Sequence, residues 1–268
     1  MGRVQSCVSE RFSVLKAAFF DIDGTLLSFK THAMPASTVR ALDALRAKGI
    51  KTVISTGRSP LELPTELQSG FDAHITINGQ LCYDDAGAFR DSPFVGEDVR
   101  VIVDKARAGE FDILVSQLGG VFVSNLSPRV RAVGKQVGLT YVEGDLDRAL
   151  AAPVYQLCAF VEPGEEQRVL EGTHSLRTTR WTELFCDVVP KEGGKDVGVH
   201  ACCERFGITP DECIAFGDGE NDLTMFSAVG TAVAMGNAWD QVKAAADYVT
   251  DDVDADGIWN ACRHFGLV

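Results

Sequence analysis

The stretch FFDIDGTLL, residues 19–27, follows directly on an apolar run that begins at Leu15. It places two carboxylates, Asp21 and Asp23, two positions apart at the point where a buried strand would end, and a glycine follows them. Aspartate and glycine are ordinary turn residues, so a surface turn is one interpretation. An active site that binds a metal ion is the other, and the rest of the sequence has to decide between them.

From Leu15 onward the sequence alternates short apolar strands with amphipathic helices, which is typical of a parallel sheet covered by helices. The strand that ends at Phe20 is apolar on both faces, as buried parallel strands are. We expect it to be followed by a helix over residues 36–49, a strand at 51–55, a short helix after Pro60 and a strand at 73–77. This order predicts an α/β fold with a doubly wound, Rossmann-like core.

The pattern changes after Tyr83, where DDAGAF (84–89) reads as a hairpin turn. Strand candidates then follow one another at 112–116, 120–124, 155–161 and 184–189, with helical stretches around Val99 and Val130. Strands that are neighbours in sequence without helices between them indicate an antiparallel sheet. Helix–strand alternation resumes after Lys195. We therefore predict a core domain of residues 1–84 and 190–268, interrupted by an inserted α+β domain of residues 85–189.

The composition excludes several classes of partner. The net charge of -13 disfavours nucleic acids and anionic membranes, whose phosphates would be repelled. It does not exclude a small anionic substrate. The 8 cysteines include no C-x-x-C pair, which favours free buried thiols in a reducing compartment, and we expect a cytoplasmic protein that is a monomer or homodimer. The opening MGRVQS fits the short pattern for N-myristoylation at Gly2.

Polar residues follow four of the predicted core strands. They are Asp21 and Asp23, Thr56-Gly57-Arg58, Asn78, and the stretch GDGEND at 217–222. In an open parallel sheet, ligands bind outside the carboxyl ends of the strands. A turn explains any one of these groups, whereas four at the same edge of the sheet indicate a site.

The carboxylates expected at this edge need a cation. Two carboxylates about 4 Å apart repel by roughly 4 kcal/mol at an effective dielectric constant of about 20. Oxygen ligands favour Mg²⁺ over zinc or copper, and Mg²⁺ commonly takes a substrate phosphate into its shell. Lys195 could supply positive charge to that phosphate, and Thr56 with the backbone around Gly57 could donate hydrogen bonds to it.

DIDGT, STGR, the lysine of PKEGGKD and GDGEND stand in the order of the four motifs of haloacid dehalogenase-like phosphatases, which this sequence resembles from Leu15 onward. The Asn78-Gly79 turn, the insertion after the third strand and VAMGNA (233–238) resemble the Cof-type subfamily, whose inserted cap is called type IIB. The resemblance implies an Mg²⁺-dependent phosphatase for small phosphate esters, with sugar phosphates as the first substrate class and pyridoxal phosphate or flavin mononucleotide behind them.

The resemblance also implies residue roles. Asp21 would attack phosphorus and become a phosphoaspartate, and Asp23 would protonate the leaving alcohol and then activate water. A free aspartic acid has a pKa near 4, so the second role requires a neighbouring carboxylate or burial to raise the pKa of Asp23. Thr56 and Lys195 would bind the transferring phosphoryl group.

The remaining implied contacts concern the metal and the substrate. Mg²⁺ would be held by Asp21, the backbone carbonyl of Asp23, Asp218 and, directly or through water, Asp222. Asn221 would lie close to the substrate phosphate, together with Gly57. Arg58 either reaches the substrate or pairs with an acidic neighbour, and Lys191 is the alternative to Lys195.

Two other functions remain open at this stage. A phosphomutase would share the chemistry of Asp21 but return the phosphoryl group to the sugar, and a non-catalytic phosphosugar-binding protein would bind without turnover. Carbon–halogen cleavage is disfavoured, because the dehalogenases lack the second aspartate of the first motif, which is Asp23 here.

Three features carry weaker signals. DVDADGIWNACR from Asp252 begins like a calcium-binding EF-hand loop, but its twelfth position is Arg263 instead of the required glutamate, so we expect a solvated loop and a helix start. His74 lies in an apolar strand and is expected in the core. Arg180 and Trp181 either contact a sugar or have only structural roles.

Overall fold

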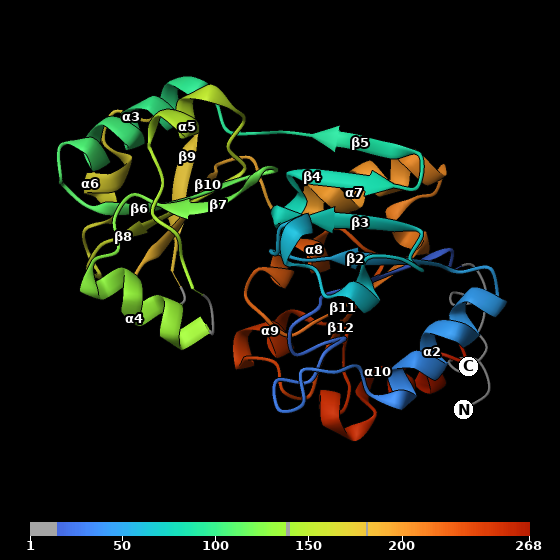
Figure 1. The fold of residues 1–268 in the computed structure, drawn as a ribbon. Coiled ribbons are helices and arrows are strands. Elements are labelled where there is room, and N and C mark those ends of the chain that lie inside the picture. Colours follow the sequence, from blue (N-terminus) through green and yellow to red (C-terminus); the bar gives the residue numbers. More distant parts are fainter. Residues whose placement is uncertain (1–14, 138–139, 181) are drawn as a thin grey trace. The chain divides into compact units, whose positions relative to one another are not determined.

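The structure is a computed structural model that describes residues 15–137, 140–180 and 182–268 (Figure 1). The chain forms two compact units. The core unit contains the residues up to Arg58, residues 62–91 and residues 194–268, and the inserted unit contains residues 59–61 and 92–193. Gly2 with its myristoylation pattern, Cys7 and Trp181 lie outside the described residues.

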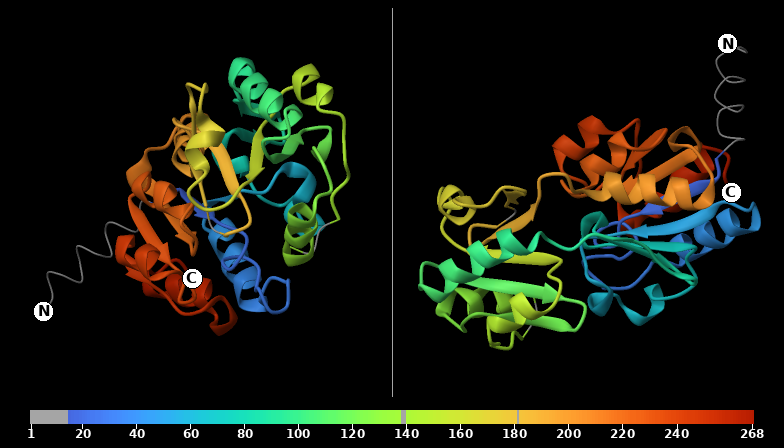
Figure 2. Two further views of the ribbon diagram at one scale, coloured as in Figure 1. Left: turned by 90° about the vertical axis from the view of Figure 1, so that its left-hand side faces the viewer. Right: turned by 90° about the horizontal axis from the view of Figure 1, so that it is seen from above.

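An eight-stranded sheet runs through the core unit in the order β13-β12-β11-β1-β2-β3-β4-β5. The strands are β1 (Ala17–Phe20), β2 (Lys51–Ser55), β3 (Ala73–Thr76), β4 (Leu81–Asp84), β5 (Gly87–Asp91), β11 (Cys213–Gly217), β12 (Thr231–Ala234) and β13 (Tyr248–Val249). The six from β13 to β3 are parallel, and β4 and β5 are antiparallel. Figure 2 shows the N-terminal blue strands and the C-terminal orange and red ones in this one sheet. The loops after β1, β2 and β11 therefore meet at one edge.

Successive strand residues point to opposite faces of the core sheet. Helices cover both of these faces. Phe20 stacks on Phe216 with ring centroids 4.9 Å apart and packs in a cluster with Leu45 and Ile258. That face is covered by α2 (Ala36–Ala47) and α10 (Gly257–His264). Phe19 packs on the other face with Val199, under α7 (Lys195–Phe206), α8 (Asp222–Ser227) and α9 (Asp240–Ala245). The doubly wound α/β core predicted from the sequence is confirmed.

Short 3₁₀ turns connect these elements. They are η1 (Pro60–Glu62), η2 (Thr65–Leu67), η3 (Ile77–Gly79), η4 (Pro210–Glu212) and η5 (Val253–Ala255). The helix expected after Pro60 is therefore two 3₁₀ turns. The hairpin expected at residues 84–89 joins β4 to β5, and β5 extends the core sheet. The compact units divide after Asp91 and after Gly193, both later in the chain than the limits after residues 84 and 189 that were expected from the sequence, and β5 belongs to the core unit.

The inserted unit contains a five-stranded antiparallel sheet in the order β7-β6-β8-β10-β9. Its strands are β6 (Asp112–Gln117), β7 (Gly120–Val123), β8 (Gln156–Phe160), β9 (Leu176–Thr179) and β10 (Cys186–Pro190). Its helices are α3 (Gly96–Arg107), α4 (Pro128–Val137), α5 (Asp147–Ala151) and α6 (Glu166–Leu170). The sequence did not predict β9, α5 or α6.

The core position expected for His74 is confirmed. His74 is buried, stacks on Tyr83, and has Nε2 2.8 Å from the Leu67 carbonyl oxygen. The seven described cysteines are buried. Within the described ranges, no helix is both long and apolar enough to cross a lipid bilayer.

Candidate active site

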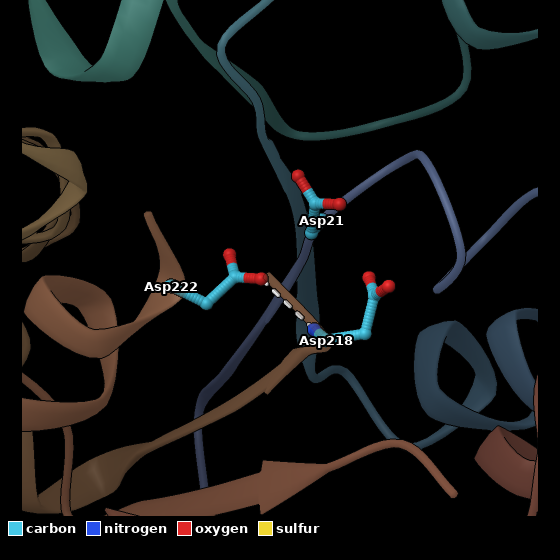
Figure 3. A group of neighbouring side chains, drawn as sticks. All are labelled: Asp21, Asp218 and Asp222. Atoms are coloured by element: carbon cyan, nitrogen blue, oxygen red, sulfur yellow. Dashed lines mark hydrogen bonds between the residues drawn. The ribbon is translucent and has the colours of Figure 1, made fainter. Parts of the chain in front are cut away.

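Three aspartates from separate segments converge at the carboxyl edge of the core sheet (Figure 3). Asp21 directly follows β1, Asp218 directly follows β11, and Asp222 is the first residue of α8. One carboxylate oxygen from each lies within 4.8 Å of the others. All three residues are buried, and Asp222 is fully inaccessible. The sequence-predicted convergence of Asp21 and Asp218 is therefore present.

Lys195 is the cation inside this cluster. It is the first residue of α7 and its side chain has no exposed surface. Its Nζ donates to Asp21 Oδ1 at 2.6 Å and to Asp222 Oδ1 at 2.6 Å. Lys191, the alternative, lies in the inserted unit and donates to the His174 carbonyl oxygen instead. The geometry thus places Lys195 beside Asp21.

The electrostatics of the cluster follow from burial and close like charges. Burial raises the pKa of Asp21 well above its usual value; Lys195 opposes this, while Asp222 and Asp218 add to it. Burial, with the nearby charge of Asp222, raises the pKa of Asp218 to about 7. Burial alone would lower the pKa of Lys195, but Asp21 and Asp222 outweigh it and the pKa is raised. One lysine therefore leaves excess negative charge in this volume.

Local backbone geometry brings Asp218 close to the loop after β1. Gly24 has a φ of +83°, which favours glycine, and a Cβ atom there would overlap the Asp218 carboxylate. Thr25 Oγ1 donates to Asp218 Oδ1 at 2.9 Å. Asp222 Oδ2 accepts from the backbone N–H groups of Asp218 and Gly219, each at 2.9 Å. The role of Thr25 was missed from the sequence, although it belongs to the quoted motif DIDGT.

This donor set fits a divalent metal ion. It is anionic and made only of oxygen, as hard cations such as Mg²⁺ prefer, and its three residues are buried. Burial is the main cause of the raised pKa values of Asp21 and Asp218, and the neighbouring carboxylates of the cluster add to it. Among the acidic, histidine and cysteine side chains of the described residues, Asp21, Asp218 and Asp222 form a group close enough together to hold a metal ion.

The carboxylate of Asp23 points to a different partner. Arg58 Nη2 donates to Asp23 Oδ1 at 2.6 Å and Arg58 Nε donates to Asp23 Oδ2 at 2.8 Å, which forms a two-pronged ion pair. Arg58 Nη1 also donates to the Glu62 carbonyl oxygen. The bond to Asp23 raises the pKa of Arg58, against the effect of burial. Of the two sequence-based options for Arg58, the structure shows the acidic neighbour. Burial or a neighbouring carboxylate was expected at Asp23 from the sequence, whereas the side chain beside it is the cation of Arg58.

The other predicted site residues meet around Asn78. Thr56 is buried after β2, and its Oγ1 accepts from the backbone N–H of Arg58 at 3.1 Å. A Cβ atom at Gly57 would lie 3.2 Å from Asn78 Nδ2. Asn221 Nδ2 donates to Asn78 Oδ1 at 3.3 Å. Asn78 has a φ of 51° and its buried neighbour Ile77 a φ of 52°. A β-branched residue such as Ile77 is strained in this left-handed region. Asn78 therefore links the loops after β2 and β11.

Arg180, in the inserted unit, has a structural role. Its Nε donates to Glu166 Oε1, and its other nitrogens donate to backbone carbonyl oxygens. These acceptors belong to Val161, Glu162, Thr182, Glu183 and Phe185. The guanidinium group is thus fully engaged within its own unit.

Comparison with known proteins gives consistent results. Residues 18–262 match the family model of haloacid dehalogenase-like hydrolases. A putative phosphatase of Bacillus subtilis (strain 168), YkrA, is 32% identical over 256 residues, which cover 94% of this chain and 98% of that protein. The HMP-PP phosphatase of Klebsiella pneumoniae (strain 342) is 28% identical, with 93% of this chain and 92% of that protein covered.

Solved structures are similar over nearly the whole chain. The phosphatase BT1666 from Bacteroides thetaiotaomicron has a TM-score of 0.88 and 35% identity, with 95% of this chain and 96% of that chain covered. The subclass IIB sugar phosphatase BT4131 has a TM-score of 0.83 and 35% identity, with coverage of 94% and 100%. These similarities extend through both the core unit and the inserted unit.

Proposed function

The chain belongs to the haloacid dehalogenase-like hydrolases as a phosphatase of the Cof type, and from that premise we propose that it hydrolyses small phosphate monoesters, chiefly sugar phosphates, with Mg²⁺ and through a phosphoaspartate at Asp21. The observation that carries this proposal is the buried group of Asp21, Asp218, Asp222 and Lys195. It combines a candidate nucleophile, a donor set suited to a divalent ion and a fixed cation in one volume.

In the first step, an Asp21 oxygen forms a bond to phosphorus while the bond from phosphorus to the ester oxygen breaks. The leaving alkoxide takes a proton from Asp23. In the second step, Asp23 takes a proton from water, the water oxygen bonds to phosphorus, and the bond to Asp21 breaks to release inorganic phosphate. Arg58 would have to release Asp23 for this, since their present ion pair occupies both oxygens of the carboxylate.

Asp21, the backbone carbonyl of Asp23 and Asp218 would hold Mg²⁺, with Asp222 bound directly or through water. When bound, the ion would neutralise charge on the phosphoryl oxygens. Lys195 would orient Asp21 and attract the phosphoryl group, because its ammonium donates to Asp21 already. Thr56, Gly57 and Asn221 would donate hydrogen bonds to the phosphate, and positioning of this kind supplies most of the catalysis of phosphoryl transfer.

We further propose that the inserted segment is a cap that selects the substrate. The sugar phosphatase named among the similar structures supports sugar phosphates as the first class to test. The HMP-PP phosphatase named among the relatives makes phosphorylated heterocycles the second. The cytoplasmic location stays a prediction, supported by the buried thiols of the described cysteines.

The test is release of inorganic phosphate from a panel of sugar phosphates, pyridoxal phosphate and flavin mononucleotide, with Mg²⁺ or with EDTA. We expect turnover that EDTA abolishes and that Asp21→Asn removes. The matched control is Asp43→Asn, an exposed aspartate paired with Arg46 on α2, which should keep full activity.

Acid quenching tests the proposed intermediate, and product analysis separates a phosphatase from a phosphomutase. Acid quenching during turnover should leave a phosphoryl group on the peptide that contains Asp21. A phosphomutase would instead give an isomeric sugar phosphate without free phosphate. Turnover by Asp21→Asn at the wild-type rate would refute the assignment of the nucleophile.

A further inference from the structure

Asn237 lies at the carboxyl end of β12, in the sequence MGNA, and has no assigned role in the reaction described above. It is half-buried and belongs to the core unit. Its Nδ2 donates to the Gly24 carbonyl oxygen at 2.8 Å and lies 3.4 Å from Asp218 Oδ2. The side chain therefore connects the loop after β1 with the aspartate after β11.

The third contact of Asn237 fixes which way its amide points. The backbone N–H of Val253 donates to Asn237 Oδ1 at 2.9 Å. A backbone N–H can only donate, so it must face the oxygen of the amide, and the nitrogen must then face Gly24 and Asp218. A flipped amide would put oxygen against two acceptors and nitrogen against a donor. One backbone group thus sets the polarity of the contact with Asp218.

Val253 comes from the segment that begins like a calcium loop. Asp252 accepts from the Asp254 backbone N–H, Asp254 pairs with Lys30, and the side chain of Val253 is buried in the core. The backbone N–H of Gly236 also donates to the Asp251 carbonyl oxygen at 2.9 Å. This acidic segment is therefore held against the MGNA turn by its own backbone, and it presents the Val253 N–H to Asn237.

Together these contacts orient Asp218 from both sides. Thr25 donates to Oδ1 and Asn237 faces Oδ2. Residues that hydrogen-bond to metal ligands fix the ligand's orientation, and their loss typically weakens metal binding by about 10- to 100-fold. We propose that Asn237, held by the Val253 N–H, is a positioning residue that orients Asp218 for the divalent metal ion. This inference rests on the proposed metal-dependent function.

The test measures Mg²⁺ binding directly, by calorimetric titration of the metal-free full-length protein, so that it does not depend on turnover. Asn237→Ala removes the donor to Asp218, and we expect the dissociation constant for Mg²⁺ to rise about 10- to 100-fold. The matched control is Asn260→Ala. Asn260 Nδ2 also donates within the acidic segment, to Asp251 Oδ2 and the Ala255 carbonyl oxygen, but not to Asp218. We expect this control to bind Mg²⁺ like the wild type.

A second pair of variants isolates the Val253 N–H and serves if Asn237→Ala does not fold. Val253 is the first residue of η5, and Asp252 before it has ψ of 152°, so the backbone accepts proline there. Val253→Pro removes the backbone N–H, whereas Val253→Ala shortens the side chain but keeps the backbone N–H. We expect Val253→Pro to bind Mg²⁺ several-fold more weakly than Val253→Ala.

The outcomes separate this inference from the proposed function. If wild-type protein binds no Mg²⁺, the proposed function is refuted and this inference with it. If wild type binds Mg²⁺ and Asn237→Ala binds it equally tightly, only the positioning role is refuted. A loss in Asn260→Ala as large as that in Asn237→Ala also refutes it, because the effect would then come from the segment's stability.

Discussion

Replacing Lys195 by methionine tests whether one buried cation holds the acidic cluster together. Each contact of Lys195 Nζ with Asp21 or Asp222 is 2.6 Å long, which corresponds to a gross attraction of about 6 kcal/mol at an effective dielectric constant of about 20. Desolvation offsets most of this. Removal of one partner from a buried ion pair is nevertheless observed to cost about 3–5 kcal/mol, because the remaining charge stays buried and unpaired.

We therefore expect Lys195→Met to lose about 3–5 kcal/mol of stability in EDTA near neutral pH. Carboxylate oxygens within 4.8 Å of each other repel by about 3.5 kcal/mol per pair under the same conditions, once the cation is gone. Two treatments should restore stability. Acid should protonate the carboxylates, and Mg²⁺ should add about 2.7 kcal/mol at 100 times its dissociation constant.

The assay is urea unfolding followed by tryptophan fluorescence, with EDTA or Mg²⁺, at about pH 7.5 and about pH 5. Lys51→Met is the control, since Lys51 makes a part-exposed ion pair with Asp72 and should cost about 1 kcal/mol or less. If Lys195→Met is as stable as wild type in EDTA at the higher pH, or if neither acid nor Mg²⁺ restores it, the reasoning fails.

Two further perturbations probe single aspartates. In the metal-free protein burial raises the pKa of Asp218 to about 7, above the value of about 3.9 expected for the unfolded chain. The stability that Asp218 contributes should therefore be fully present below that unfolded value and be lost as pH rises towards about 7. Urea midpoints in EDTA should show this decline, Asp218→Asn should flatten it, and a flat wild-type curve would contradict it. Burial acts to raise the pKa of Asp98, but hydrogen bonds from Ser175 and His174 outweigh burial and lower this pKa. The stability that Asp98 contributes is therefore present above about pH 3.9 and is lost as pH falls through the lower pKa of the folded state. Asp98→Asn would turn an NH₂ group towards one of the two backbone N–H groups of His174 and Ser175. This change should cost the inserted unit about 1–3 kcal/mol and speed hydrogen exchange at 174–190; unchanged exchange would argue against this role.

Much of the core unit could be predicted because its strands are short apolar runs that end in polar residues. The run before Asp21 and the run before Asp218 each fill both faces of a parallel sheet, so their carboxyl ends had to meet at one edge. A buried group of carboxylates needs a cation beside it, and Lys195 at the start of α7 was the candidate for that cation.

The parts that were missed depend on contacts between distant segments. β9 begins with Leu176 but continues with Arg177, Thr178 and Thr179, so it lacks an apolar run, and its pairing with β10 makes it a strand. The partner of Asp23 was left open, because pattern alone does not show that Arg58 turns back to it. Asn237 is 19 residues from Asp218 in sequence, and an asparagine after a strand is also an ordinary turn residue.

The position of Arg180 also matters for engineering. An arginine near the end of an inserted segment is a natural choice for randomisation when a phosphatase is to be redirected to a new substrate. Here its guanidinium ties the 161–166 segment to the 182–185 segment through carbonyl oxygens and Glu166. Lysine cannot reproduce that planar set of donors. Libraries built on this scaffold should therefore keep Arg180 constant and vary neighbouring exposed positions.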